Sequence, residues 1–159
     1  MDERTRVDES MLGDLLLRAV GIFGLLGIGL IHFLDVFGKF KETPYLAWLY
    51  LALIAGCLVA STLLLRPDAR LGWSAAFVLS VATFTGYVLS RTTGLPAATG
   101  DIGNWTEPLG LASLFVEGLV MATSIMVLSG ATSRIRRSTW APQFVERTRS
   151  YALGSGSRR

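Results

Sequence analysis

The sequence has a single cysteine, Cys57, and a single histidine, His32. An internal disulfide, a CxxC redox pair, a zinc cluster of Cys and His ligands, and a haem held by two histidines each need more of these residues. A single copy of this chain therefore cannot form any of these four sites. The sequence also lacks a glycine-rich phosphate loop and a GxSxG nucleophile elbow, so no catalytic residues are predicted.

Charge is scarce as well. Charged residues make up 17% of the 159 residues, whereas hydrophobic residues make up 51%. A soluble domain usually has roughly 25% charged residues, so this balance predicts a membrane protein. The length suits one compact domain, because about 100 to 200 residues make a domain.

Four apolar stretches are long enough to cross a hydrocarbon core, which takes about 20 helical residues. They cover residues 15–37, 45–65, 71–90 and 108–130. The breaks between them contain charged residues, Gly or Pro, which typically end and start helices. The predicted fold class is all-α: a polytopic membrane protein with four transmembrane helices in an antiparallel bundle, the domain covering residues 15–130.

The distribution of positive charge predicts the orientation. Residues 1–14 are rich in acidic side chains and have no signal-peptide cleavage site, so we expect them to remain as an N-terminal segment. With four spans, both chain ends lie on one side, together with twelve of the fifteen Lys and Arg residues. Positive residues gather on the cytoplasmic side. Both ends are therefore predicted to be cytoplasmic, and Lys39, Lys41 and Arg91 to face outward.

The segment 131–159 is predicted to be a basic cytoplasmic tail with seven Arg residues. Such a tail suits an anionic inner leaflet. A cytoplasmic flank of a span requires the same residues, however, and this simpler interpretation explains them without a specific lipid or nucleic-acid site. The expected partner is the lipid bilayer, and no nucleic acid is expected.

Glu117 is the most informative residue. It follows Pro108 by nine positions, which at about 1.5 Å per residue places it roughly 13 Å into a core about 30 Å thick. A charged carboxylate there is costly, so Glu117 should face the bundle interior and be protonated or paired. Thr83 lies at similar depth and Tyr87 about one turn shallower, so both are candidate donors. His32 is the one side chain that would bring positive charge near it.

Two interpretations of the outer end remain open. In one, His32, Asp35 and Glu117 bind a cation, a proton or a small cationic molecule in an outward-facing pocket. In the other, His32 pairs with Asp35, and Glu117 links helices by bonding Tyr87 or Thr83. We favour the pocket because ionisable groups inside membranes usually mark function. The predicted ligand-binding residues are Glu117, His32, Asp35, Tyr87, Thr83, Asp101, Glu107 and Trp105.

The outer segment 91–107 is unusually apolar for a loop. Leu95-Pro96, Ile102 and Trp105 are apolar anchors that would fold it back over the bundle as a lid. Asp101, Asn104 and Glu107 would present oxygens to a hard cation, but the run lacks the spacing of a calcium loop. No metal site is therefore predicted.

Three strings carry a resemblance: GLIHFLD at 29–35, TPYL at 43–46, and SRTTGLPAATGDIGNWTEPLGLASLFVE at 90–117. With them, residues 15–130 resemble small four-helix integral membrane proteins of actinobacterial type. The resemblance implies an integral membrane location in a bacterial cell membrane. It implies no reaction.

Three functions compete. The first is an outward-facing pocket around Glu117 and His32 that binds or transports a small molecule or ion, linked to a proton. Four helices are too few to enclose a large path, so transport predicts a homo-oligomer. The second is a non-catalytic accessory subunit of a larger membrane complex, docked through the small-residue row Ala52, Gly56 and Ala60 and through the basic tail.

The third function is quinone oxidoreduction near His32, Trp48 and Tyr87. The chain has no ligand set for a common redox cofactor, so no cofactor is expected and an enzyme is the less favoured class.

Overall fold

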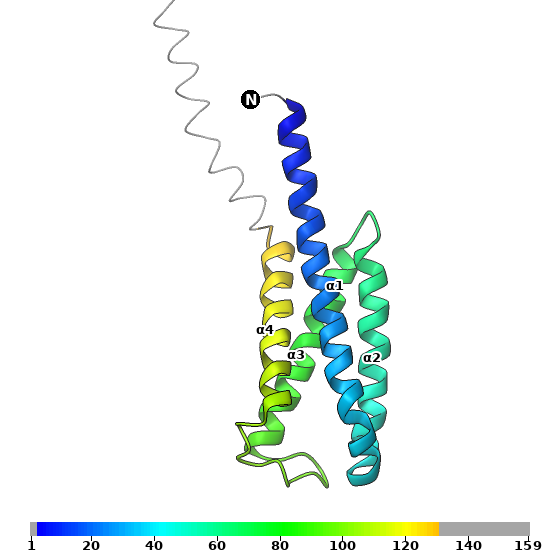
Figure 1. Ribbon diagram of the computed structural model, residues 1–159, viewed down its shortest axis with the longest axis vertical. Coiled ribbons are helices and arrows are strands. Elements are labelled where there is room, and N and C mark those ends of the chain that lie inside the picture. Colours follow the sequence, from blue (N-terminus) through cyan, green and yellow to red (C-terminus); the bar gives the residue numbers. More distant parts are fainter. Residues whose placement is uncertain (1–2, 131–159) are drawn as a thin grey trace, which may run out of the picture. The chain divides into compact units, whose positions relative to one another are not determined.

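The computed structural model describes residues 3–130, with side chains from Met11 onward. It contains four helices, α1 (Glu3–Glu42), α2 (Pro44–Leu64), α3 (Arg70–Thr92) and α4 (Pro108–Leu128), and no strand within the described part (Figure 1). The structure separates into two units after Ile125, and the helix packing described in this section is that of the unit that ends at Ile125. The predicted all-α class is confirmed. The predicted basic tail, 131–159, lies outside the described residues.

Each helix contains a segment long and apolar enough to span a membrane: Met11–Glu42, Pro44–Leu64, Arg70–Thr92 and Pro108–Leu128. The protein is therefore a multi-pass membrane protein. Three segments match the predicted spans to within two residues at each end. α1 differs, because it begins at Glu3 and continues past the predicted end at residue 37 to Glu42.

α1 and α2 are joined by one residue, Thr43. Its N–H donates to the Lys39 carbonyl at 2.8 Å, and its carbonyl accepts from the Leu46 N–H at 3.0 Å. Pro44 occupies the first turn of α2, where a missing N–H breaks no helical hydrogen bond. Because the residue before a proline avoids the helical region, α1 stops here. The turn reverses the chain, so α2 packs back along α1.

Two glycines of α1 allow its neighbours to approach closely. A Cβ on Gly21 would lie 2.8 Å from the Trp73 indole of α3, and a Cβ on Gly24 would overlap Val120 of α4. Close backbone approach is a main source of helix association in membranes, since lipid tails are as apolar as the side chains. α1 thus contacts α2, α3 and α4.

The core lies between the helices, where Leu25, Ile28 and Leu64 are fully buried. The outer faces are equally apolar, and Phe23 and Phe115 are each 74% exposed. A soluble monomer rarely exposes so much apolar surface. Such faces suit a lipid environment.

Arg18 of α1 contacts the turn between α2 and α3. Its guanidinium donates to the carbonyls of Leu64, at 3.0 Å, and of Arg66 and Pro67, and pairs with Asp14 at 2.8 Å. The last carbonyls of a helix have no partner within it and carry partial negative charge. Arg18 therefore satisfies the α2 C-terminus from α1.

Candidate functional site

A cavity of about 540 Å³ lies within the bundle, and all four helices contribute to its wall. It reaches the end that contains the α1–α2 turn and the α3–α4 loop, residues 39–45 and 91–107, which we call the long-loop end (Figure 1). Small-molecule sites in proteins typically measure roughly 300 to 1,000 Å³ and are mostly apolar. The cavity has the size of such a site.

Six of the eight predicted site residues line this cavity: His32, Asp35, Thr83, Tyr87, Asp101 and Glu107. Glu117 lies behind the wall, next to the lining residue Ser113. Trp105 is outside the wall and 43% exposed, with its ring edge-on to Tyr87 at a centroid distance of 6.1 Å. The predicted residues thus gather at one place, with Glu117 beneath it and Trp105 at its rim.

Glu117 is 1% exposed, as predicted for a carboxylate that faces the bundle interior. Its Oε1 accepts a hydrogen bond of 2.6 Å from the Ser113 hydroxyl. Its Oε2 has no hydrogen-bond partner among the described residues. The groups that face it from the other helices are His32 of α1, Cys57 of α2 and Thr83 of α3. One buried carboxylate oxygen is therefore left without a donor.

Of the two predicted donors to Glu117, Thr83 lies beside the carboxylate and interacts with it, but neither Thr83 nor Tyr87 directs its hydroxyl hydrogen bond to it. The Thr83 hydroxyl donates within its own helix, to the Leu79 carbonyl at 2.9 Å. The Tyr87 hydroxyl has no hydrogen-bond partner within the described part of the chain. A serine four residues earlier on the same helix satisfies Glu117 instead, because residues at i and i+4 are neighbours on a helix surface.

His32 and Asp35 do not pair either. Nδ1 of His32 lies 2.9 Å from the Ile28 carbonyl, which can only accept, so Nδ1 carries the proton and Nε2 is left for other contacts. The ring stands edge-on to Tyr50 at 4.7 Å. Asp35 lies beside the Tyr50 hydroxyl and forms no ion pair with any residue from 11 to 130. Tyr50 is the site residue missed from sequence; a hydroxyl-bearing ring within an apolar span was its signal.

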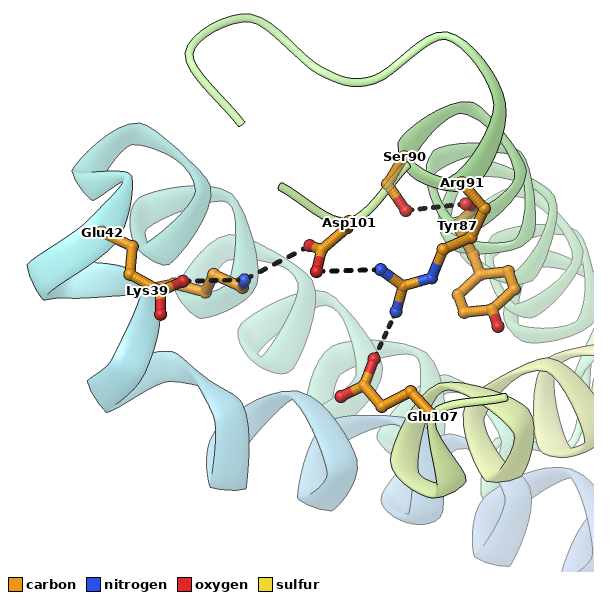
Figure 2. Close-up of polar contacts among 7 residues, drawn as sticks. All are labelled: Lys39, Glu42, Tyr87, Ser90, Arg91, Asp101 and Glu107. Atoms are coloured by element: carbon orange, nitrogen blue, oxygen red, sulfur yellow. Dashed lines mark hydrogen bonds and ion pairs between the residues drawn. The ribbon is translucent and has the colours of Figure 1, made fainter. Parts of the chain in front are cut away.

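A chain of alternating charges crosses the long-loop end (Figure 2). Lys39 Nζ lies 3.1 Å from Glu42 Oε2 and 3.6 Å from Asp101 Oδ2. Arg91 Nη1 lies 3.1 Å from Asp101 Oδ1, and its Nη2 donates to Glu107. Arg91 is 5% exposed, and its guanidinium also lies over the Tyr87 ring. Each cation thus faces two carboxylates.

The α3–α4 loop forms part of the cavity wall through Leu95, Pro96, Ala98 and Asp101. The Tyr45 hydroxyl of α2 donates to the Pro96 carbonyl at 2.7 Å. Of the predicted apolar anchors, Leu95 and Pro96 line the cavity, whereas Ile102 and Trp105 do not and are 47% and 43% exposed. The loop is attached by hydrogen bonds and ion pairs more than by buried apolar anchors.

No group of three or more His, Cys, Asp or Glu residues with the geometry for a metal ion occurs between residues 11 and 130. The carboxylates of Asp101 and Glu107, once considered for a hard cation, both face Arg91. Arg91 therefore balances their negative charge within the chain.

Neither a protein-family model, nor a curated protein, nor a solved structure matches this chain. Function therefore has to be inferred from the cavity and from the charges around it. Chemically, the cavity offers an apolar wall, three tyrosines (Tyr45, Tyr50 and Tyr87), and carboxylates at its mouth and beneath its floor.

Proposed function

We propose that this protein binds or transports a small molecule or ion through an outward-facing cavity in a bacterial cell membrane. The observation that carries the proposal is the cavity of about 540 Å³ with Glu117 directly behind its wall. Leaving a buried carboxylate oxygen without a partner is costly. A site that exchanges protons or ligands would explain why this carboxylate oxygen has no partner.

The orientation follows from the charge pattern. The long-loop end contains Lys39, Lys41 and Arg91, and the other positions of Lys and Arg flank the opposite end or the chain termini. With the positive-rich side in the cytoplasm, the cavity opens outward. Reporter fusions at both termini test this: activity of a cytoplasmic reporter at both ends is expected, and a periplasmic signal at either end would exclude the proposed orientation.

Proton coupling is assigned to Glu117. Ser113 donates to one of its oxygens, while the other can hold a proton or lose it. The remaining titratable groups that face it are His32 and Cys57. Binding of an uncharged ligand should therefore depend on pH in the wild type and become independent of pH in Glu117→Gln. His32→Gln should retain the dependence, which separates the two groups.

The cavity itself is tested with three probes that have the same apolar part and differ in the head group: 3-phenylpropylammonium, 3-phenylpropan-1-ol and 3-phenylpropanoate. Gly86 lines the cavity, and a Cβ there meets no atom within 4 Å. Gly86→Phe is expected to fill the space and abolish binding of every probe that the wild type binds. Gly118 of α4 is equally open but does not line the cavity, so Gly118→Phe is the matched control and should bind normally.

Binding is measured by equilibrium dialysis against the protein in lipid nanodiscs, with empty nanodiscs subtracted. Binding that Gly86→Phe leaves unchanged for all probes, or no binding at all, would contradict the proposed function.

Transport through so small a chain calls for a homo-oligomer, which the mass of the particle in mild detergent will report. The alternative role as an accessory subunit rests on the basic tail, 131–159, which lies outside the described residues, and on the row Ala52, Gly56 and Ala60. Gly56 packs against Leu79 of α3, and Ala60 is fully buried. Two of the three residues thus pack within the chain and give the alternative no support.

A further inference from the structure

The wall of the cavity favours a ligand with an apolar body. Aliphatic side chains are the largest group in the lining, and three tyrosines join them: Tyr45, Tyr50 and Tyr87. Aromatic faces attract cations that have been removed from water. A bare or hydrated inorganic ion would leave most of this apolar wall without contact, whereas an organic molecule would cover it.

The charges at the mouth exclude an anion as the natural occupant. Lys39 faces Glu42 and Asp101, and Arg91 faces Asp101 and Glu107. An anion would have to displace carboxylates that already neutralise both cations. The five charged groups together carry one net negative charge at neutral pH, so the mouth attracts cations.

Asp35 is the carboxylate of the cavity wall that forms no ion pair with any residue from 11 to 130. It is half-buried and lines the cavity one helical turn above His32. Lys39 follows on the next turn, but its ammonium is directed to Glu42 and Asp101. The Tyr50 hydroxyl of α2 lies beside Asp35 and brings no positive charge. Lys39 also acts on Asp35 electrostatically but forms no ion pair with it, so this half-buried carboxylate can serve as the counter-ion of a ligand.

We infer that the ligand is a monovalent organic cation with an apolar or aromatic body, and that Asp35 is its counter-ion. The inference rests on the proposed function, because it names the ligand class of the same cavity. The ammonium or guanidinium group would lie between Asp35 and the Tyr50 ring, and the apolar body would extend toward Leu53 and Leu79. Binding would then place positive charge above the buried carboxylate of Glu117.

The three phenylpropyl probes test the charge directly, since only the head group differs among them. In nanodiscs of zwitterionic lipid, we expect the ammonium to bind at least about tenfold more tightly than the alcohol, and the carboxylate to bind most weakly. Asp35→Asn should remove the advantage of the ammonium and leave the alcohol unchanged. Asp35→Glu should retain it.

Asp68→Asn, in the α2–α3 turn away from the cavity, is the control and should change none of the three affinities. Equal binding of ammonium and alcohol, or an advantage that survives Asp35→Asn, would overturn the inference. In that case binding that remains sensitive to Gly86→Phe keeps the proposed function. If Asp35→Asn and Asp35→Glu both fail to bind the alcohol as well, Asp35 shapes the cavity and is not the counter-ion.

Discussion

Ser113 donates a hydrogen bond of 2.6 Å to Oε1 of Glu117, four residues later on α4. Both side chains are buried, and Ser113 is part of the cavity wall in front of the carboxylate. Removing this donor would leave both carboxylate oxygens without a described partner. We therefore expect Ser113→Ala to lower the free energy of unfolding by about 1 to 3 kcal/mol, measured by denaturant titration in detergent micelles.

Ser80 provides the matched control, because its hydroxyl is fully buried and has no hydrogen-bond partner in the described region. Ser80→Ala removes an unsatisfied group and should leave stability unchanged or raise it. Equal losses in the two variants would show that the Ser113 hydroxyl does not stabilise Glu117.

Arg91 links the α3–α4 loop to the start of α4 through Asp101 and Glu107. Arg91→Gln removes the charge that both carboxylates face. We expect a loss of about 2 kcal/mol, less than for a fully buried pair because both carboxylates are more than a third exposed. Hydrogen exchange should rise in residues 93–107 and stay unchanged in α2. Arg70→Gln, at an exposed position, should affect neither.

Gly24 lies against Val120 so closely that any Cβ would overlap the valine side chain. Gly24→Ala should therefore force α1 and α4 apart and destabilise the bundle by about 1 to 3 kcal/mol. Gly118→Ala adds the same methyl group where no atom lies within 4 Å, and alanine is the better helix former. Its thermal midpoint should be equal to or above that of the wild type. A stable Gly24→Ala variant would contradict the packing.

Arg18 donates to three carbonyls at the end of α2, across from α1. Arg18→Met keeps the apolar stem and removes every donor. We expect a loss of about 1 to 3 kcal/mol, because hydrogen bonds to charged groups exceed neutral ones. Arg66→Met, an exposed arginine of the same turn, is the control. Increased exchange in residues 62–66 should accompany the loss only in Arg18→Met.

Much of the fold was predictable because apolar runs of about 20 residues in a membrane must form helices, which satisfy their own backbone groups. Pro44 and Pro108 marked two helix starts correctly. The ends of α1 were underestimated, because the Glu, Arg and Lys residues there are good helix formers and do not lower helical propensity. Hydropathy detects where a helix enters the apolar region, and not where it ends.

The site was predictable where burial decides it. The position of Glu117 within its span required it to face the interior, and it does. Its partner was not predictable, because the choice among Ser113, Thr83 and Tyr87 depends on side-chain rotamers and on competing carbonyls such as that of Leu79. Tyr50 was missed for a related reason: the apolar pattern of α2 is nearly uniform around the helix, so it does not show which side lines the cavity.

Cys57 is buried, at 1% exposure, so thiol reagents can be directed to introduced cysteines in the otherwise natural chain. It is the single cysteine of the sequence, and a membrane-impermeant maleimide has no access to it in the folded protein. A cysteine introduced at an exposed loop position such as Thr99 would thus be the only reactive sulfur. With the proposed outward orientation, accessibility of the long-loop end can be followed in whole cells, with and without a bound molecule, without first removing a native thiol.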